Sequence, residues 1–258
     1  MNTTSDPEAH SISLRNLARR FINRTRPKFN RQRHRFAGMH GLEVGGPSHV
    51  FSKTGPLPVY EIAHRIDNLD FSNSTFWIPG DRAEKFRPSP RLEAGSNFYI
   101  DSHDLTQMEA QRYDFLIASH VIEHLANPIK SVLEWKRLLK QNGTMVLIAP
   151  CKFFSYDCDR PTTTISHLIE DYQRNVGEDD LTHMDEVISK HNLKKDATVS
   201  SLAQHIARTK ENPVNRIMHH HVFNLKLLRA MGEYCGLQIL ESEYILPRHV
   251  VCFFRRQT

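Results

Sequence analysis

The chain has 258 residues and a net charge of +5, and 39% of its residues are apolar and 24% charged. This balance is typical of a globular protein with one large core, and it excludes an intrinsically disordered chain. The apolar runs are shorter than the roughly 18 residues that cross a bilayer, and the polar opening from Met1 to His10 leads us to expect no signal peptide.

The positive charge is concentrated at the N-terminus. Residues 1–36 hold nine arginines and lysines against two acidic residues, which leaves a net charge of −2 for residues 37–258. A nearly neutral body argues against nucleic acid as a partner. The four cysteines form no CxxC pair, so we expect reduced thiols and a cytoplasmic protein.

A basic arm, residues 1–36, precedes the body. Residues 11–24 have the apolar period of a helix, with Leu14, Leu17 and Phe21 on one face and four arginines away from it. This helix could pack on the body as a lid, or it could lie on an anionic membrane and place the protein at the inner membrane face. Contact with nucleic acid is the third and least favoured interpretation.

From residue 39 onward, short apolar segments alternate with helical ones, a pattern typical of an α/β sheet. The predicted strands are residues 41–44, 63–67, 97–101, 113–119, 144–149, 237–245 and 250–254. Asn127 and Pro128 predict the start of a helix that runs to Lys140, and Gly236 ends another that begins at Asn224. We therefore predict one domain, residues 37–258, with a helical insertion at residues 151–218.

Polar residues and glycines follow the predicted strands. Gly45 and Gly46 follow the first strand, Asp67 ends the second, Asp104 follows the third, and His120 follows the fourth. In open α/β sheets, ligands bind beyond the carboxyl ends of the strands, and glycine lets the backbone approach them closely. An acid some 22 residues after the glycine turn can hold a ribose diol. Each acid could instead cap a turn, and the glycines could form an ordinary one.

Two stretches resemble the class I S-adenosylmethionine-dependent methyltransferases. They are Tyr113–Pro128, YDFLIASHVIEHLANP, and Leu138–Pro150, LLKQNGTMVLIAP. The resemblance covers roughly residues 37–150 and 219–256. It implies an α/β, Rossmann-like fold, a seven-stranded and mostly parallel sheet whose last strand is antiparallel, and S-adenosyl-L-methionine as the cofactor. Asp157–Tyr172 and His219–Phe223 resemble a bacterial subgroup whose members often accompany glycosyltransferase and glycan genes.

The resemblance also implies a set of cofactor-binding residues. Glu43 and Gly45 would border the methionine part, Asp67 would bind the ribose, and Asp104 with the Leu105 amide would meet the adenine. The full set is Glu43, Gly45, Gly46, Asp67, Asn68, Asp104, Leu105 and Ser119. The sequence departs from the usual GxGxG series at Pro47, which lacks an N–H and fixes φ, so the loop takes another shape.

Methyl transfer to oxygen gains about 10²–10⁴-fold from a general base, and histidine titrates in the useful range. The catalytic candidates are His120, His167 and His220. His120 follows a buried strand, and His167 lies four residues before Asp171 on a predicted helix, which could equally be a solvated surface. For His124 we favour a structural role.

Histidines 219–221 raise the question of a metal. The side chains of adjacent residues diverge, so one ion cannot bind all three, and no recognised ligand spacing is present. We therefore expect no metal. Glu178, Asp179, Asp180 and His183 form a further polar group with no assigned use.

The predicted function is methyl transfer to a hydroxyl or amine of a small-molecule or glycan-related acceptor. Two alternatives stay open at this point. The first is a methyltransferase-like protein that binds the cofactor without turnover, and the second is an RNA or protein methyltransferase. The oligomeric state cannot be read from the sequence.

Overall fold

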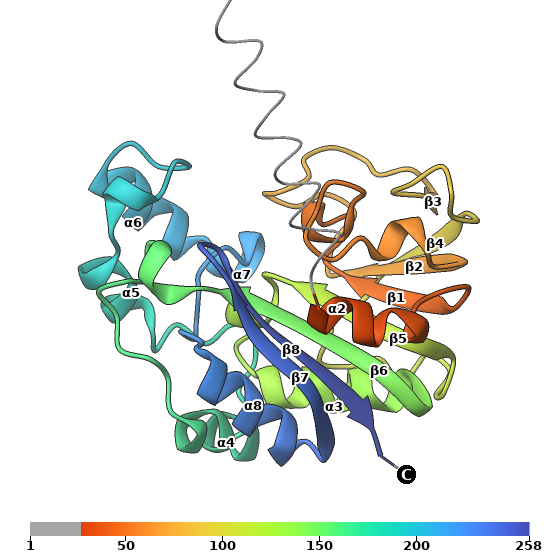
Figure 1. Cartoon of the computed structure of the whole chain (residues 1–258). Helices are drawn as coiled ribbons and strands as arrows, with labels where there is room; N and C mark the ends of the chain where they lie inside the picture. Colours follow the sequence, from red (N-terminus) through yellow and green to blue (C-terminus); the bar gives the residue numbers. More distant parts are fainter. Residues whose placement is uncertain (1–26, 258) are drawn as a thin grey trace, which may run out of the picture.

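The computed structural model describes residues 27–257, so most of the basic arm, with its predicted helix 11–24, lies outside the described residues. Within that range the chain forms one twisted sheet with helices on both faces (Figure 1). None of the helices in this range is both long and apolar enough to cross a membrane.

The sheet has eight strands in the order β3-β4-β2-β1-β5-β6-β8-β7. Their bounds are β1 His40–Val44, β2 Arg65–Asp70, β3 Lys85–Phe86, β4 Gly95–Tyr99, β5 Tyr113–Ser119, β6 Leu139–Pro150, β7 Leu237–Ile245 and β8 His249–Arg256. Strand β8 is antiparallel to both of its neighbours, whereas β4, β2, β1, β5 and β6 are parallel. The sheet confirms the predicted fold class and adds β3, whose two residues are too few to show a periodic pattern.

Two apolar cores cover the two faces of the sheet. One lies under three helices, with Trp135 of α3 (Pro128–Leu138), Leu168 of α4 (Ile165–Gln173) and Leu228 of α8 (Leu225–Tyr234) all fully buried. The other, with Phe36 and Phe115, lies on the opposite face, against α2 (Pro27–Gln32) and short 3-10 turns. Both faces are therefore closed, as a parallel sheet requires.

The chain between β6 and β7 contains helices α4 to α8. Besides α4 and α8 these are α5 Met184–Lys190, α6 Leu202–Lys210 and α7 Asn212–Asn215. Figure 1 shows α5, α6 and α7 beyond the carboxyl end of β6, at the edge where the parallel strands also end. The inserted residues thus lie over the edge at which sheets of this kind bind their ligands.

The predicted helix starts at Asn127 and Asn224 are confirmed. The Asn127 side chain accepts from the Lys130 amide at 3.1 Å, and that of Asn224 accepts from the Leu227 amide at 2.8 Å. The first helix ends at Leu138, two residues before its predicted end at Lys140, because β6 begins at Leu139.

Asn127 also holds the insertion. Its buried amide group donates to the carbonyl oxygens of Asp171 and Val176, at 3.2 and 3.4 Å. We predict that Asn127→Ala lowers the free energy of unfolding by about 2–3 kcal/mol, because a cap is lost and two carbonyls lose their donor. The matched cap variant Asn224→Ala should cost only about 1 kcal/mol. Urea unfolding of both measures the difference, and equal losses would contradict the linking role of Asn127.

Candidate active site

The turn after β1 requires its two glycines. Gly45 has a φ of +73°, and a Cβ there would lie 2.6 Å from the Val121 side chain. A Cβ on Gly46 would lie 2.5 Å from the carboxyl carbon of Glu43. A side chain at either position would collide with its neighbours, so glycine suits both, and neither residue adds a side chain of its own to the turn.

Glu43 supports this turn from inside. Its carboxylate accepts from the Ser48 amide at 2.9 Å and from the Tyr60 hydroxyl at 2.6 Å, and the side chain is fully buried. Burial raises the pKa of Glu43 to about 7, although both hydrogen bonds oppose this. In the structure Glu43 shapes the Gly45–Ser48 loop, and its place beside the methionine part of a cofactor stays a prediction.

Asn68 joins the glycine turn to two strands. Its Oδ1 accepts from the Gly46 amide at 2.9 Å, and its Nδ2 donates to Asn97 Oδ1 at 3.1 Å. The side chain lies next to the turn, as its place in the cofactor set would require.

The structure contradicts the ribose-binding prediction for Asp67. This residue lies inside β2, and its fully buried carboxylate points toward the first residues of the neighbouring strands. Its partners are His40, Arg65, Arg112, the Tyr113 hydroxyl and the Ser96 amide. Burial opposes ionisation, but the hydrogen bonds from His40, Ser96 and Arg65 outweigh it and lower the pKa of Asp67. Asp67 thus ties strands together at the opposite edge of the sheet.

Asp70 is the acid at the carboxyl end of β2, because the strand runs three residues beyond its predicted end. Its carboxylate accepts from the Phe71 amide at 2.8 Å and from Arg82 at 2.7 Å. Arg82 also donates to the Gly46 carbonyl at 3.2 Å, so Asp70 lies beside the glycine turn. The sequence does contain this acid: Asp70 follows Asp67 by three residues, and a longer predicted strand would have ended at it.

Asp104 and Leu105 also lie away from the expected site. The exposed Asp104 carboxylate binds only Thr106 among the residues described. Leu105 bonds to Glu134 and Arg137 in the last turns of α3, which run back toward the amino ends of the strands. Asp101, two residues after β4, lies nearer to the carboxyl end of that strand, and it pairs with Arg216 of the insertion.

Ser119 and His120 lie at the carboxyl end of β5, as predicted. His120 has a φ of +55°, and its Nε2 lies 2.9 Å from Nδ1 of His249. Burial and the nearby His249 and His219 lower the pKa of His120 to about 3. This imidazole is neutral at physiological pH, but it is a weak base.

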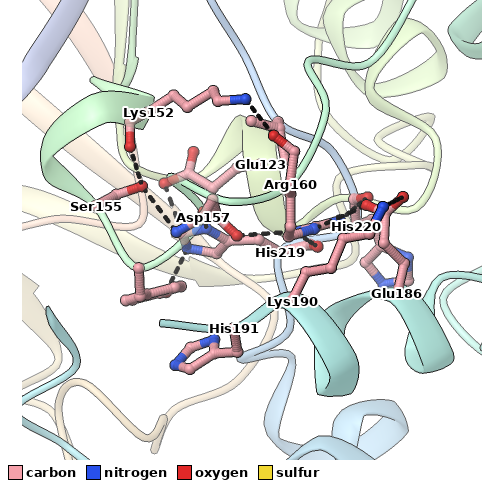
Figure 2. Close-up of polar contacts among 12 residues, drawn as sticks. Glu123, Lys152, Ser155, Asp157, Arg160, Glu186, Lys190, His191, His219 and His220 are labelled. Atoms are coloured by element: carbon pink, nitrogen blue, oxygen red, sulfur yellow. Dashed lines mark hydrogen bonds and ion pairs between the residues drawn. The ribbon is translucent and has the colours of Figure 1, made fainter. Parts of the chain in front are cut away.

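A buried Asp–His pair lies close to this end of β5 (Figure 2). Nδ1 of His219 is 2.5 Å from Oδ2 of Asp157, and its Nε2 is 2.6 Å from the Tyr156 hydroxyl. Glu123, in the turn after β5, lies 3.9 Å from the same Nε2. Burial disfavours the charged form of Asp157, but His219 and Arg160 outweigh it and lower its pKa.

Arg160 fixes the position of this pair. It donates to Asp157 Oδ1 at 2.8 Å, to the carbonyl oxygens of His219 and His220 at 2.8 and 3.1 Å, and to Glu186 at 3.0 Å (Figure 2). All of these acceptors belong to the protein, so this arginine organises the site rather than binding an acceptor.

The three predicted catalytic histidines do not converge. The ring of His220 is buried against Asn212, at 3.1 Å, and His167 faces His183 and Asp171 at 3.1 and 3.3 Å. Of the three, only His120 lies at the end of β5. The residue that the sequence analysis missed is His219, because a run of three histidines does not reveal which of them meets an acid.

Two groups among residues 27–257 have side chains suited to a metal ion. They are Glu123, His124 and His219, and His167, Asp171, His183 and His221. In the first group both ring nitrogens of His219 already have partners. The triplet of histidines diverges as predicted, with His219, His220 and His221 directed to different neighbours.

A family model described as a methyltransferase domain matches residues 12–242. The chain belongs to this methyltransferase family. It is an enzyme that uses S-adenosylmethionine as its methyl donor. No curated protein matches the chain.

Several solved structures are similar to this methyltransferase. One is a 1,6-didemethyltoxoflavin N1-methyltransferase from Burkholderia thailandensis, with 12% identity, coverage of 100% of this chain and 93% of that chain, and a TM-score of 0.47. Another is a SAM-dependent methyltransferase from Aquifex aeolicus, with 10% identity, 88% coverage of each chain and a TM-score of 0.44. These values assign no substrate to the chain.

The side chains at the carboxyl edge suit this cofactor. The glycine turn offers a bare backbone, and Asp70 and Asp101 provide carboxylates after β2 and β4. We expect these residues, with Asn68 and Ser119, to hold the methyl donor of the methyltransferase.

Asp70 and Asp67 give a matched test of this site. We predict that Asp70→Asn weakens cofactor binding at least about tenfold, which is the loss of one charge-assisted hydrogen bond. Asp67→Asn should leave the affinity within about twofold and instead lower the free energy of unfolding by about 3 kcal/mol, because buried partners lose their counter-charge. Calorimetry with S-adenosylhomocysteine and urea unfolding separate the two effects. The reverse result would restore Asp67 to the cofactor site.

Proposed function

We propose that this methyltransferase acts on a hydroxyl group of a small, polar, sugar-like acceptor, and that the Asp157–His219 pair accepts the hydroxyl proton. The observation that carries the proposal is the 2.5 Å contact between Asp157 Oδ2 and His219 Nδ1. A carboxylate at Nδ1 selects the tautomer with a free lone pair at Nε2 and stabilises the imidazolium that forms there.

His219 is better suited to this role than His120. His120 has a second imidazole, His249, as its neighbour, which disfavours a positive charge on either ring. His219 has the carboxylate of Asp157 on one side and that of Glu123 nearby on the other. Asp157 and Glu123 thus place carboxyl oxygens on both sides of the His219 ring, whereas His120 faces another imidazole, so we assign the proton to His219.

The proton path needs few groups. The acceptor hydroxyl competes with the Tyr156 hydroxyl for Nε2 of His219, and its proton moves to that nitrogen while the Nδ1 proton stays bonded to Asp157. Burial and the neighbouring acids raise the pKa of Tyr156 well above its usual value, so Tyr156 remains a neutral donor. S-adenosylmethionine, when bound, would supply the methyl group to the acceptor oxygen, and its sulfur would keep the electron pair of the broken carbon–sulfur bond, giving S-adenosylhomocysteine.

Asp157 and His219 line two small pockets. On the β6 side, the other polar lining residues include Glu123, Lys152 and Ser155, and on the insertion side they include His191, Arg208 and Thr209. Such a mixture of charged, hydroxyl and imidazole groups is suited to an acceptor with many hydroxyls. The resemblance of residues 157–172 and 219–223 to a subgroup found with glycan genes supports the same class of acceptor.

We predict that His219→Ala lowers kcat by about 10²–10⁴-fold, because the proton acceptor is removed. Asp157→Asn should lower it as well, since the amide no longer favours the imidazolium. Steady-state kinetics and calorimetry with S-adenosylhomocysteine check both, and cofactor affinity should stay within about twofold. His64→Ala, on the surface beside Glu93, is the matched control. Full activity of His219→Ala would exclude this base.

The acceptor class is tested with cofactor that carries a radioactive methyl group. Cell material is fractionated into carbohydrate, lipid-linked, protein and RNA pools, and the purified enzyme is added to each. We expect the label in a carbohydrate or lipid-linked pool, as a methyl ether identified by mass spectrometry. Label in protein, RNA or an amine would contradict the proposal, and so would cofactor binding with no labelled pool.

A further inference from the structure

We propose that the group His167, Asp171, His183 and His221 binds a divalent transition-metal ion of the zinc class. One ligand atom from each of the four side chains lies within 4.8 Å of the others. The group comes from three separate parts of the chain: helix α4, the residue before α5, and the segment that follows α7. It lies outside the cofactor residues and the Asp157–His219 pair.

The separations match those between the ligands of one ion. Nε2 of His167 lies 3.1 Å from Nε2 of His183 and 3.3 Å from Oδ2 of Asp171, and the imidazole ring of His221 comes within 3.8 Å of the same oxygen. Bonds of about 2.0–2.1 Å to a tetrahedral zinc ion place neighbouring ligand atoms about 3.3–3.4 Å apart. The observed values bracket this distance.

Two atoms of this group, Oδ2 of Asp171 and Nδ1 of His221, have no hydrogen-bond partner among the residues described, while His167 and His183 share one hydrogen bond. Oδ2 of Asp171 is buried and accepts no hydrogen bond from any residue in 27–257. Two Nε2 atoms that face each other cannot both carry a proton and cannot both lack one without losing their contact. Nε2 of the buried His221 ring lies 3.2 Å from the Ala126 carbonyl and donates to it, so Nδ1, which has no hydrogen-bond partner within the described chain, is the nitrogen whose lone pair is available to an ion. A cation at the centre would satisfy these atoms together.

The donor types indicate the class of ion. Three imidazoles and one carboxylate suit zinc and neighbouring first-row metals rather than calcium or magnesium, which prefer oxygen ligands. His167 and Asp171 are four residues apart on α4, so they share one face of that helix. The His167 side chain is 38% exposed, which gives an ion a route from solvent.

The alternative group, Glu123, His124 and His219, is a weaker candidate. Asp157 and Tyr156 already occupy both ring nitrogens of His219. The contacts of Glu123 with His124 and His219 are 4.0 and 3.9 Å and involve the same carboxylate oxygen. An ion at that group could bind His219 only if the ring gave up its contact with Asp157 or with Tyr156.

An ion in the proposed site would link three parts of the stretch between β6 and α8 to one another. It would join α4 and the start of α5 to the segment that also carries His219. Metal binding that links separate segments adds its binding free energy to folding. The ion would therefore stabilise the segments around the proposed acceptor site, and it would take no part in the methyl transfer.

The test measures metal directly. Full-length protein without a histidine tag is stripped with a chelator and titrated with zinc chloride against a chromophoric competitor. We expect about one equivalent of tightly bound zinc for the wild type, a ligand-field spectrum with Co²⁺, and a higher thermal midpoint with metal than without. Absence of stoichiometric binding would overturn the proposal, whatever the methyl-transfer activity of the protein.

Variants locate the site. Asp171→Asn keeps the shape of the side chain, and His167→Ala changes a half-exposed side chain. We therefore expect both variants to fold when the chelator has removed the metal, and neither to bind the one equivalent of zinc tightly. His183→Ala should lose it too, with far-ultraviolet circular dichroism to confirm folding. The surface variant His64→Ala and the alternative-site variant Glu123→Gln should keep it. The proposed site would be overturned if Asp171→Asn and His167→Ala still bound one equivalent of zinc tightly, or if only Glu123→Gln lost that zinc.

Discussion

The candidate active site depends on one buried cation, the guanidinium of Arg160. It is only 1% exposed, and a charge so far from water must be matched by acceptors. Asp157 and Glu186 supply carboxylates, and the backbone of His219 and His220 supplies carbonyls. The same contacts join the segment that carries Asp157, helix α5 and the histidine segment, so Arg160 helps to hold the imidazole of His219 against its acid.

The proposed cofactor side and the proposed acceptor side of the enzyme are stabilised by different kinds of interaction. The cofactor side depends on strand ends and on a turn where no side chain fits, so its shape follows from the sheet itself. The acceptor side depends on a polar network of aspartate, arginine and histidine within an insertion of short helices. A buried polar network gains most when its members are paired with one another, and Asp157, Arg160 and His219 are paired in this way.

The sequence predicted the features that depend on local pattern. The strands with continuous apolar runs, such as residues 113–119, and the helix caps Asn127 and Asn224 were confirmed, because each depends on neighbours three or four residues away. The end of β2 was misplaced, because Asp67 is a charged residue inside a buried strand. Its partners Arg112 and Tyr113 lie 45 and 46 residues further along the chain, and no local pattern announces them.

The same limit applied to the histidines. Asp157 and His219 are 62 residues apart, and the sequence offered three adjacent histidines with no sign of which one would meet the acid. His167 was expected to act in catalysis because it shares a helix face with Asp171. The face was identified correctly, but its neighbours His183 and His221 come from other segments and give it a different chemical setting.

The origin of the base has a consequence for specificity. The residues beside the glycine turn come from the first half of the chain, whereas Asp157 and His219 lie at the two borders of the stretch between β6 and α8. Exchanging that stretch for one of another length would therefore alter which molecule is recognised while the donor is held as before. On the proposed assignment, donor binding and acceptor choice therefore depend on different parts of the chain.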